Sequence, residues 1–168
     1  MPTARALTGR RLAWALVGVF VLSALAPSGL SDASANSPQY RYRKSEKCFM
    51  RKINRVRASH GQRRLNWDKQ LGYVARRHAR TLARHGGVWH DQNLGHRVTR
   101  WRSLGQNTGA GGRCKRLFRS FMGSAPHRAN ILGRWRFIGV GTKRKNGRLY
   151  VQQIFETRRN PGNVWSWP

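Results

Sequence analysis

Apolar residues recur at spacings of three and four in three stretches of the chain, and this period predicts three helices. The first spans residues 45–60, the second follows Asp68 and reaches residue 85, and the third spans residues 113–123. The apolar positions are Phe49, Ile53 and Val56 in the first, Leu71, Val74, Ala75, Ala79 and Leu82 in the second, and Cys114, Leu117, Phe118, Phe121 and Met122 in the third. His78 falls on the apolar face of the second helix, where a histidine is usually packed and hydrogen-bonded.

Two later stretches, 135–142 and 149–156, are rich in β-branched and aromatic residues and predict strands. They are joined around Asn146-Gly147, a dipeptide that favours a tight hairpin turn. Residues 103–109 form a shorter stretch that can pair as a strand. Helices around a small, mainly antiparallel central sheet predict an α+β fold, built as a three-layer α-β-α sandwich.

Two stretches break this regular pattern. Residues 87–102 form a long irregular loop, and a loop of that length in a compact domain is more often functional than filler. In residues 121–132, the apolar stripe of the third helix stops at Pro126, His127 follows at once, and a short polar segment carries Asn130. A titratable ring at a helix exit, with polar groups on both sides, indicates the wall of a cleft.

The N-terminal residues 1–35 have the features of an export signal: a basic start, an apolar run at 13–25 and a small-x-small cleavage pattern. The apolar run is too short to span a bilayer comfortably. We therefore expect a secreted, extracellular protein with no transmembrane segment after cleavage. The remaining chain is expected to consist of a lead-in at 36–44, one domain at 45–160 and a C-terminal tail at 161–168.

The whole chain carries a formal net charge of +29, from 34 basic and 5 acidic residues. Residues 1–35 hold three of the basic residues and one acid, so 31 basic and 4 acidic residues leave +27 for the mature chain. This imbalance makes the folded protein repel itself and attracts polyanions, so we expect a monomer whose partners are anionic surface polymers or lipid headgroups. Sequence-specific nucleic-acid binding needs a recognition motif as well as charge, and none is found. The alternative is that exposed positions drifted toward arginine, because the basic residues are scattered along the chain.

Cys48 and Cys114 are the two cysteines, and they stand near the starts of the first and third predicted helices. An even pair in an exported chain predicts one disulfide. In the chain-entropy model a bridge of this span stabilises the fold by about 4 kcal/mol. A metal pair is disfavoured because no Cys-x-x-Cys or close Cys-His spacing is present.

A series of short motifs follows in order along the domain. The motifs are Ile53-Asn54-Arg55-Val56-Arg57, Leu65-Asn66-Trp67-Asp68, His78-Ala79, Trp89-His90-Asp91, Leu104-Gly105-Gln106-Asn107, His127-Arg128-Ala129-Asn130-Ile131-Leu132, Gly139-Val140-Gly141 and Tyr150-Val151-Gln152-Gln153-Ile154-Phe155. This set resembles the CAP superfamily, the domain shared by cysteine-rich secretory proteins, insect venom allergens and plant pathogenesis-related proteins. It is most similar to the bacterial secreted branch, the SCP-like extracellular proteins.

The resemblance implies an α-β-α sandwich with a large central cleft. In many members two histidines and two glutamates line that cleft, and the histidines can take a divalent metal. His90 and His127 look like the two histidines, whereas Gln106 stands in place of the first glutamate and Ser124 lies where the second is expected. Glutamine cannot carry a proton or offset the charge of a cation. The resemblance therefore implies no required cofactor and at most a weakly bound divalent ion, such as zinc, on the two histidines.

The main functional hypothesis is a non-catalytic binding module with a degenerate histidine-lined cleft for a lipid or other small ligand. The candidate cleft residues are His90, Gln106, Asn107, Ser124, His127 and Asn130. The first alternative is a charge-driven binder of polyanions or membrane surfaces, for which the cleft is incidental. The second is a hydrolase that uses His90 or His127, although no Gly-x-Ser-x-Gly elbow is present and acids are too few for a paired-carboxylate mechanism.

Overall fold

The computed structural model describes residues 40–157, and the expected export signal (1–35) and tail (161–168) lie outside this range. The helices are α1 Lys44–Ser59, α2 Lys69–His85, α3 Leu94–Arg97, α4 Cys114–Gly123 and α5 Ala125–Leu132. The strands are β1 Asn66–Trp67, β2 Leu104–Gly111, β3 Phe137–Lys145 and β4 Arg148–Glu156. Within residues 40–157, no helix is long and apolar enough to cross a membrane.

The four strands form one sheet in the order β1-β3-β4-β2. β1 runs parallel to β3, and the remaining pairs are antiparallel, so the sheet is mainly antiparallel as predicted. The β3–β4 hairpin turns at Asn146 and Gly147, both with positive φ (47° and 71°), the backbone that an Asn-Gly hairpin turn requires. Because β2 pairs only with β4, it forms one edge of the sheet.

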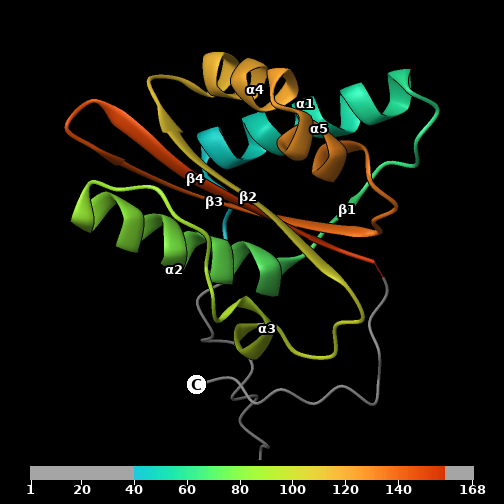
Figure 1. Ribbon diagram of the computed structural model, residues 1–168, viewed down its shortest axis with the longest axis horizontal. Helices are drawn as coiled ribbons and strands as arrows, with labels where there is room; N and C mark the ends of the chain where they lie inside the picture. The colour runs from blue at the N-terminus through green and yellow to red at the C-terminus, as the bar shows by residue number, and fades with distance from the viewer. Residues whose placement is uncertain (1–39, 158–168) are drawn as a thin grey trace, which may run out of the picture. The chain divides into compact units, whose positions relative to one another are not determined.

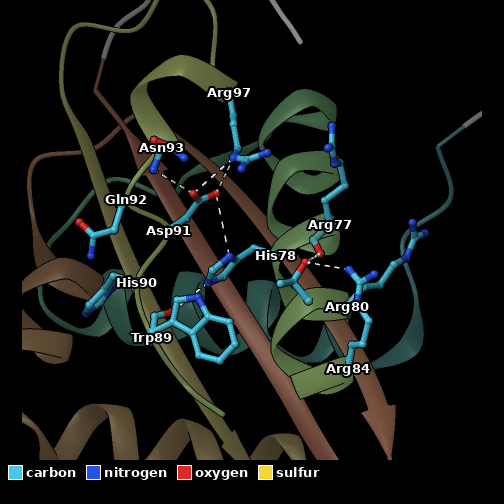
Figure 2. A pocket seen from close by; sticks show the side chains of 11 residues that line it. Arg77, His78, Arg80, Arg84, Trp89, His90, Asp91, Gln92, Asn93 and Arg97 are labelled. Carbon is cyan, nitrogen blue, oxygen red and sulfur yellow. Dashed lines mark hydrogen bonds and ion pairs between the residues drawn. The ribbon is translucent and has the colours of Figure 1, made fainter. Parts of the chain in front are cut away.

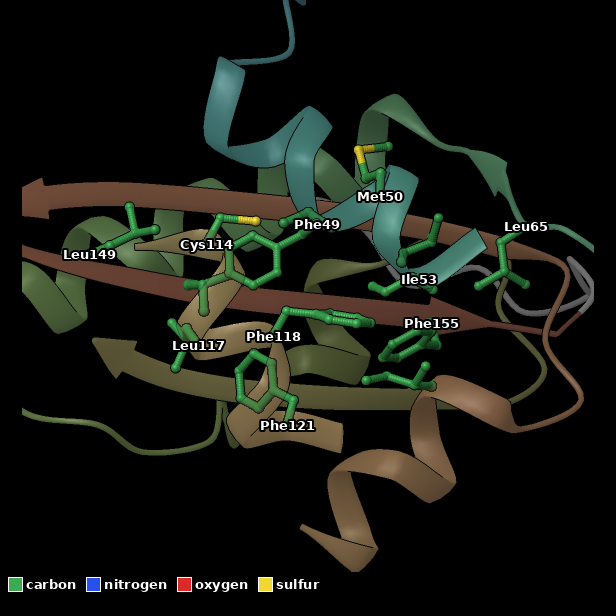
Figure 3. Packing of buried hydrophobic residues seen from close by; sticks show 14 residues of the cluster. Phe49, Met50, Ile53, Leu65, Cys114, Leu117, Phe118, Phe121, Leu149 and Phe155 are labelled. Atoms are coloured by element: carbon green, nitrogen blue, oxygen red, sulfur yellow. The ribbon is translucent and has the colours of Figure 1, made fainter. Parts of the chain in front are cut away.

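Helices cover both faces of this sheet (Figure 1). α2 packs on one face, where Leu71, Val74 and Ala75 meet Ile154 of β4. α1, α4 and α5 cover the other face around a larger cluster of buried side chains, which includes several aromatic rings (Figure 3). The predicted α+β fold with three layers is therefore confirmed.

The predicted disulfide is also confirmed. Cys48 of α1 and Cys114 of α4 are bonded, with their Cα atoms 6.5 Å apart. A second connection holds α5 in place: the Arg57 side chain, only 1% exposed, donates to the carbonyls of Ile131 and Gly133, both at 2.8 Å. A cation at the carbonyl end of a helix satisfies acceptors that have no partner within the helix. These two links fix the helices on which the candidate site depends.

A buried carboxylate joins the two helical layers through the sheet. Glu46 of α1 is fully buried and accepts hydrogen bonds from Arg76 of α2 at 2.9 and 2.5 Å. The same carboxylate accepts from the backbone N–H of Thr142 on β3 at 3.2 Å and from that of Arg43 at 2.7 Å. The charge is thus paired and its oxygens are hydrogen-bonded, as a buried ion requires.

The structure differs from the sequence-based prediction at residues 125–132. The prediction ended the third helix at residue 123 and gave His127 to a short polar segment after it, whereas a further helix, α5, begins at Ala125. Proline is tolerated in the first helical turn, where its missing N–H would have no partner. His127 is therefore in the first turn of a helix rather than at a helix exit.

Smaller differences concern the strands and the long loop. β2 continues to Gly111, two residues beyond the stretch 103–109 that was predicted to pair as a strand. The two-residue strand β1 was not predicted, and the 87–102 loop contains the short helix α3. The two strand segments are set by pairing partners distant in the chain, such as Phe137 for Asn66.

Two glycines of β3 allow α2 to approach the sheet closely. A Cβ built on Gly141 would lie 2.0 Å from backbone atoms of Ala75 and Arg76, whereas one on Gly112 would have no atom within 4 Å. Because the clash is with backbone, Gly141→Ala is expected to lower the free energy of unfolding by about 3 kcal/mol. Gly112→Ala, the matched control, should change it by no more than about 0.5 kcal/mol. Urea unfolding curves measure both values, and equal stabilities for the two variants would contradict this packing.

Candidate functional site

Two of the candidate residues, Gln106 and Asn107, are neighbours on the edge strand β2, so their side chains point to opposite faces of the sheet. The Gln106 side chain lies on the α2 face. Its Oε1 accepts from the backbone N–H of Asp91 at 3.0 Å and from Gln152 Nε2 at 2.8 Å, and its Nε2 donates to the Asp91 carbonyl at 3.2 Å. The Gln106 amide therefore fixes the loop that carries His90 against the sheet.

Asn107 points the other way, toward α5, and is fully buried. Its Nδ2 donates to the His127 carbonyl and to Gln153 Oε1, both at 3.1 Å. Asn130 donates in turn to Asn107 Oδ1 at 2.9 Å and to the Gln106 carbonyl at 3.0 Å. These amides hold α5 on β2, so their hydrogen-bonding capacity is largely used within the protein.

His127 and Ser124 form a contact of their own at the start of α5. His127 Nδ1 lies 2.8 Å from Ser124 Oγ, and its ring packs on Phe121 with centroids 4.9 Å apart. Burial lowers the pKa of His127, and the nearby charge of His90 lowers it further. The two histidines thus approach β2 from elements on opposite faces of the sheet, close enough for their charges to interact.

A pocket of about 520 Å³ opens beside His90 on the α2 side of the sheet (Figure 2). Its lining residues are Arg77, His78, Arg80, Thr81 and Arg84 of α2, and Trp89, His90, Asp91, Gln92, Asn93 and Arg97 of the following loop and α3. The arginines of α2 stand on one side of the pocket and His90 on the other. We call this cavity the His90 pocket.

The one carboxylate of this pocket is already paired. Asp91 is 7% exposed, and Arg97 Nε lies 3.1 Å from its Oδ2 and 3.3 Å from its Oδ1. The buried His78 donates from Nε2 to the Trp89 carbonyl at 2.9 Å, because a carbonyl can only accept. That bond leaves His78 Nδ1 facing Asp91 Oδ2 at 4.0 Å, beyond hydrogen-bonding distance. The remaining arginines give the pocket an excess of positive charge.

The donor set does not fit a resident metal ion. Among residues 40–157, no group of three or more His, Cys, Asp or Glu side chains is arranged to hold one. His90 and His127 supply two imidazoles, and the oxygen of Gln106 already accepts two hydrogen bonds. Catalytic zinc sites usually have three protein ligands. Weak zinc binding by the two imidazoles therefore stays a prediction.

The structure brings the predicted residues together around β2, but it gives several of them structural contacts. Gln106, Asn107 and Asn130 position the loop and α5, whereas His90, His127 and Ser124 lie on either side of the strand. Sequence reasoning missed the arginines of α2. Arg77, Arg80 and Arg84 repeat at spacings of three and four on the polar face of the helix, a signal that could have identified one basic stripe.

Solved structures of three bacterial proteins show the same fold. An extracellular protein with an SCP domain from Bacillus anthracis is 24% identical with a TM-score of 0.61; the match covers 68% of this chain and 40% of that one. An outer surface protein from Borrelia burgdorferi is 16% identical with a TM-score of 0.65; the match covers 71% of this chain and 97% of that one. A cysteine-rich secretory protein from Staphylococcus aureus is 22% identical with a TM-score of 0.54; the match covers 72% of this chain and 41% of that one.

At these identities the likeness concerns the fold alone, and the chain spans less than half the length of the B. anthracis and S. aureus proteins. No curated protein matches the chain. The sequence does match the family model described as "CAP: Cysteine-rich secretory protein family", over residues 50–155. That range includes α2, the His90 pocket, β2 and α5, and it is more than half of the chain. This chain therefore belongs to the CAP, or cysteine-rich secretory protein, family.

Proposed function

We propose that this protein is an extracellular, non-catalytic binding module that takes a small anionic ligand in the His90 pocket. The observation that carries the proposal is the charge of the pocket lining. Four arginines stand against one carboxylate, and that carboxylate is paired with Arg97. A guanidinium can give two parallel hydrogen bonds to a phosphate or carboxylate, so such a lining favours an anion with several oxygen acceptors.

The size and shape of the pocket support a small molecule. Its volume of about 520 Å³ lies within the range of typical small-ligand sites. Trp89 is 40% exposed at the pocket, and its ring contacts His78 and His85 edge-on. An exposed ring beside cations suits a ligand that combines an anionic group with a flat apolar part. A long lipid tail is a poorer fit, because polar and charged side chains dominate the lining.

Binding is favoured over catalysis because the amides near the histidines are used to position β2 and α5. The Ser124–His127 contact is the one geometry that favours the hydrolase alternative. A serine nucleophile also needs an oriented base and donors for the developing oxyanion. Asp91, the acid of this region, pairs with Arg97 and so does not serve as the orienting group for His127.

Three observations support the extracellular location. The first 35 residues have the features of an export signal. The B. anthracis and B. burgdorferi structures are named as an extracellular protein and an outer surface protein. The disulfide fits this location, because such bonds persist in oxidising compartments.

The arginines of the pocket can be tested with inorganic phosphate as the probe. Arg77→Gln with Arg80→Gln should weaken phosphate binding at least about tenfold, because charge-assisted hydrogen bonds are lost. The control, Lys69→Gln with Arg102→Gln, removes the same charge at exposed positions outside the pocket and should bind as the parent does. Calorimetry at low salt measures both, and an equal loss in the two double variants would refute a localised site.

The coupling of the two histidines can be tested by proton titration. NMR of the ring protons should give His127 a pKa below the ordinary histidine value, so the ring is neutral at pH 7. Because the folded state disfavours the charged ring, His127 should reduce stability as the pH falls below about 6.5. His90→Gln should raise the pKa of His127 only in part, since burial is the larger cause.

His60→Gln is the matched control for that titration, because His60 lies at the exposed end of α1. It should leave the pKa of His127 unchanged. A His127 pKa at or above the ordinary value, or an equal response to both substitutions, would show that His90 and His127 do not face a common space.

A further inference from the structure

A second basic concavity lies at the end of the domain where β3 turns into β4. It has a volume of about 820 Å³. Its lining consists of Arg113, Lys115, Arg116 and Arg119 beside and along α4, Arg144 of β3, and the glycines Gly112 and Gly147. Five of these seven residues are cationic and none is acidic. This site shares no residue with the His90 pocket.

The positive charge continues around the hairpin turn. Lys143, Lys145 and Arg148 are exposed on the turn or beside it. Lys145 Nζ donates to the Arg84 carbonyl of α2 at 3.1 Å, and a smaller hollow of about 220 Å³ lies between the turn and the end of α2. We call residues 112–119 and 143–148 the hairpin end.

No acid of the described residues lies at the hairpin end. Glu46 is buried with Arg76, Asp68 accepts from the Leu71 N–H at the opposite end of α2, and Asp91 pairs with Arg97. Glu156 pairs in register with Leu104 and Phe137, which places it at the far end of the sheet from the hairpin turn. Residues 40–157 therefore supply no carboxylate to offset the cations gathered there.

The floor of the concavity is open. A Cβ on Gly112 or Gly147 would have no atom within 4 Å, so a ligand can approach the backbone between the arginines. The cations lie on two elements, α4 and the hairpin, with the groove between them. A row of anionic groups along that groove would contact both sides at once.

We propose that the hairpin end is a docking surface for a flexible linear polymer whose charges are phosphates. Arginine pairs with phosphate through two hydrogen bonds, and the cations lie on both sides of the groove, where successive phosphates of one chain can contact them together. A bilayer is disfavoured, because interfacial binding also uses apolar side chains. Of residues 40–157, the exposed large apolar side chains are Trp67, Tyr73, Val88 and Trp89, all outside the hairpin end.

The polymer is recognised through its charge rather than its sequence. Tyr150, the aromatic residue at the smaller hollow, is 5% exposed and cannot serve as a stacking platform for a base. Contacts to phosphates alone carry no sequence information. Binding should therefore weaken steeply as salt rises, because each neutralised phosphate releases a counterion.

Inorganic polyphosphate is the probe for this surface. Lys115→Gln with Arg119→Gln should lower its affinity about 20-fold at 0.1 M salt and reduce the slope of log K against log salt by about 1.4. The control, Lys69→Gln with Arg102→Gln, removes the same charge at the other end of the sheet and should leave both quantities near the parent values. An equal effect of the two double variants would overturn the proposal.

A second pair of variants adds a negative charge instead. Gly112→Glu places it in the groove and Gly123→Glu places it outside the concavity, and neither site has an atom within 4 Å of a new Cβ. Only Gly112→Glu should weaken polyphosphate binding, with both proteins unfolding at the parent temperature. Tight binding to vesicles of anionic phospholipid, with little affinity for polyphosphate, would assign the surface to a membrane and overturn the proposal.

The test is independent of the proposed ligand in the His90 pocket. The variants at the hairpin end should bind inorganic phosphate in that pocket as the parent does. Conversely, Arg77→Gln with Arg80→Gln should lose phosphate binding there but keep the salt slope for polyphosphate. If either set of variants lost both phosphate binding and polyphosphate binding, the anions would be held by the overall positive charge of the surface rather than by two separate sites.

Discussion

The buried carboxylate of Glu46 is the interaction on which the arrangement of layers depends. It joins α1, α2 and β3, three elements that come from distant parts of the chain. Removing one partner of a buried ion pair costs about 3 to 5 kcal/mol, because the other charge is left uncompensated. With α2 held against β3 in this way, the glycines of β3 permit close packing, and the loop after α2 reaches Gln106 on the edge strand.

The surface is strongly positive because the acidic side chains of the described domain are buried or already paired. Glu46 is buried, Asp68 caps α2, Asp91 pairs with Arg97, and Glu156 lies fully buried at the end of β4. The carboxylates of the described domain are therefore buried, cap a helix or pair with an arginine. Basic side chains on the outside have few acids to offset them, and they gather in the His90 pocket and at the hairpin end. The proposed anion binding rests on this separation of charges within the fold.

The sequence predicted the elements whose own periodicity defines them. α1, α2 and α4 follow apolar stripes, and the β3–β4 hairpin follows from Asn146-Gly147. The helix α5 was missed because Pro126 signals a helix end as well as a first turn, and its stabilising partner, Arg57, lies 74 residues before Ile131. β1 was missed because a two-residue strand is defined only by its neighbour on β3.

For the candidate site, too, the sequence indicates residues with a local motif but not the contacts between residues distant in the chain. The motifs identified His90, Gln106 and His127, but they could not show that the Gln106 amide is bonded to Asp91 and Gln152. Those contacts join residues 15 and 46 positions apart. The arginines of α2 resemble an ordinary solvated face in the sequence, and only the path of the following loop turns that face into the wall of a pocket.

The central claim is that the His90 pocket is a defined anion site rather than part of a uniformly positive surface. A titration of isotope-labelled protein with inorganic phosphate, followed residue by residue through backbone amide NMR signals, tests this most directly. A defined site should give large, saturating shifts at Trp89, His90 and Asp91, with little change at Lys69 and Arg102. Shifts of similar size across all basic segments, with no saturation, would contradict it.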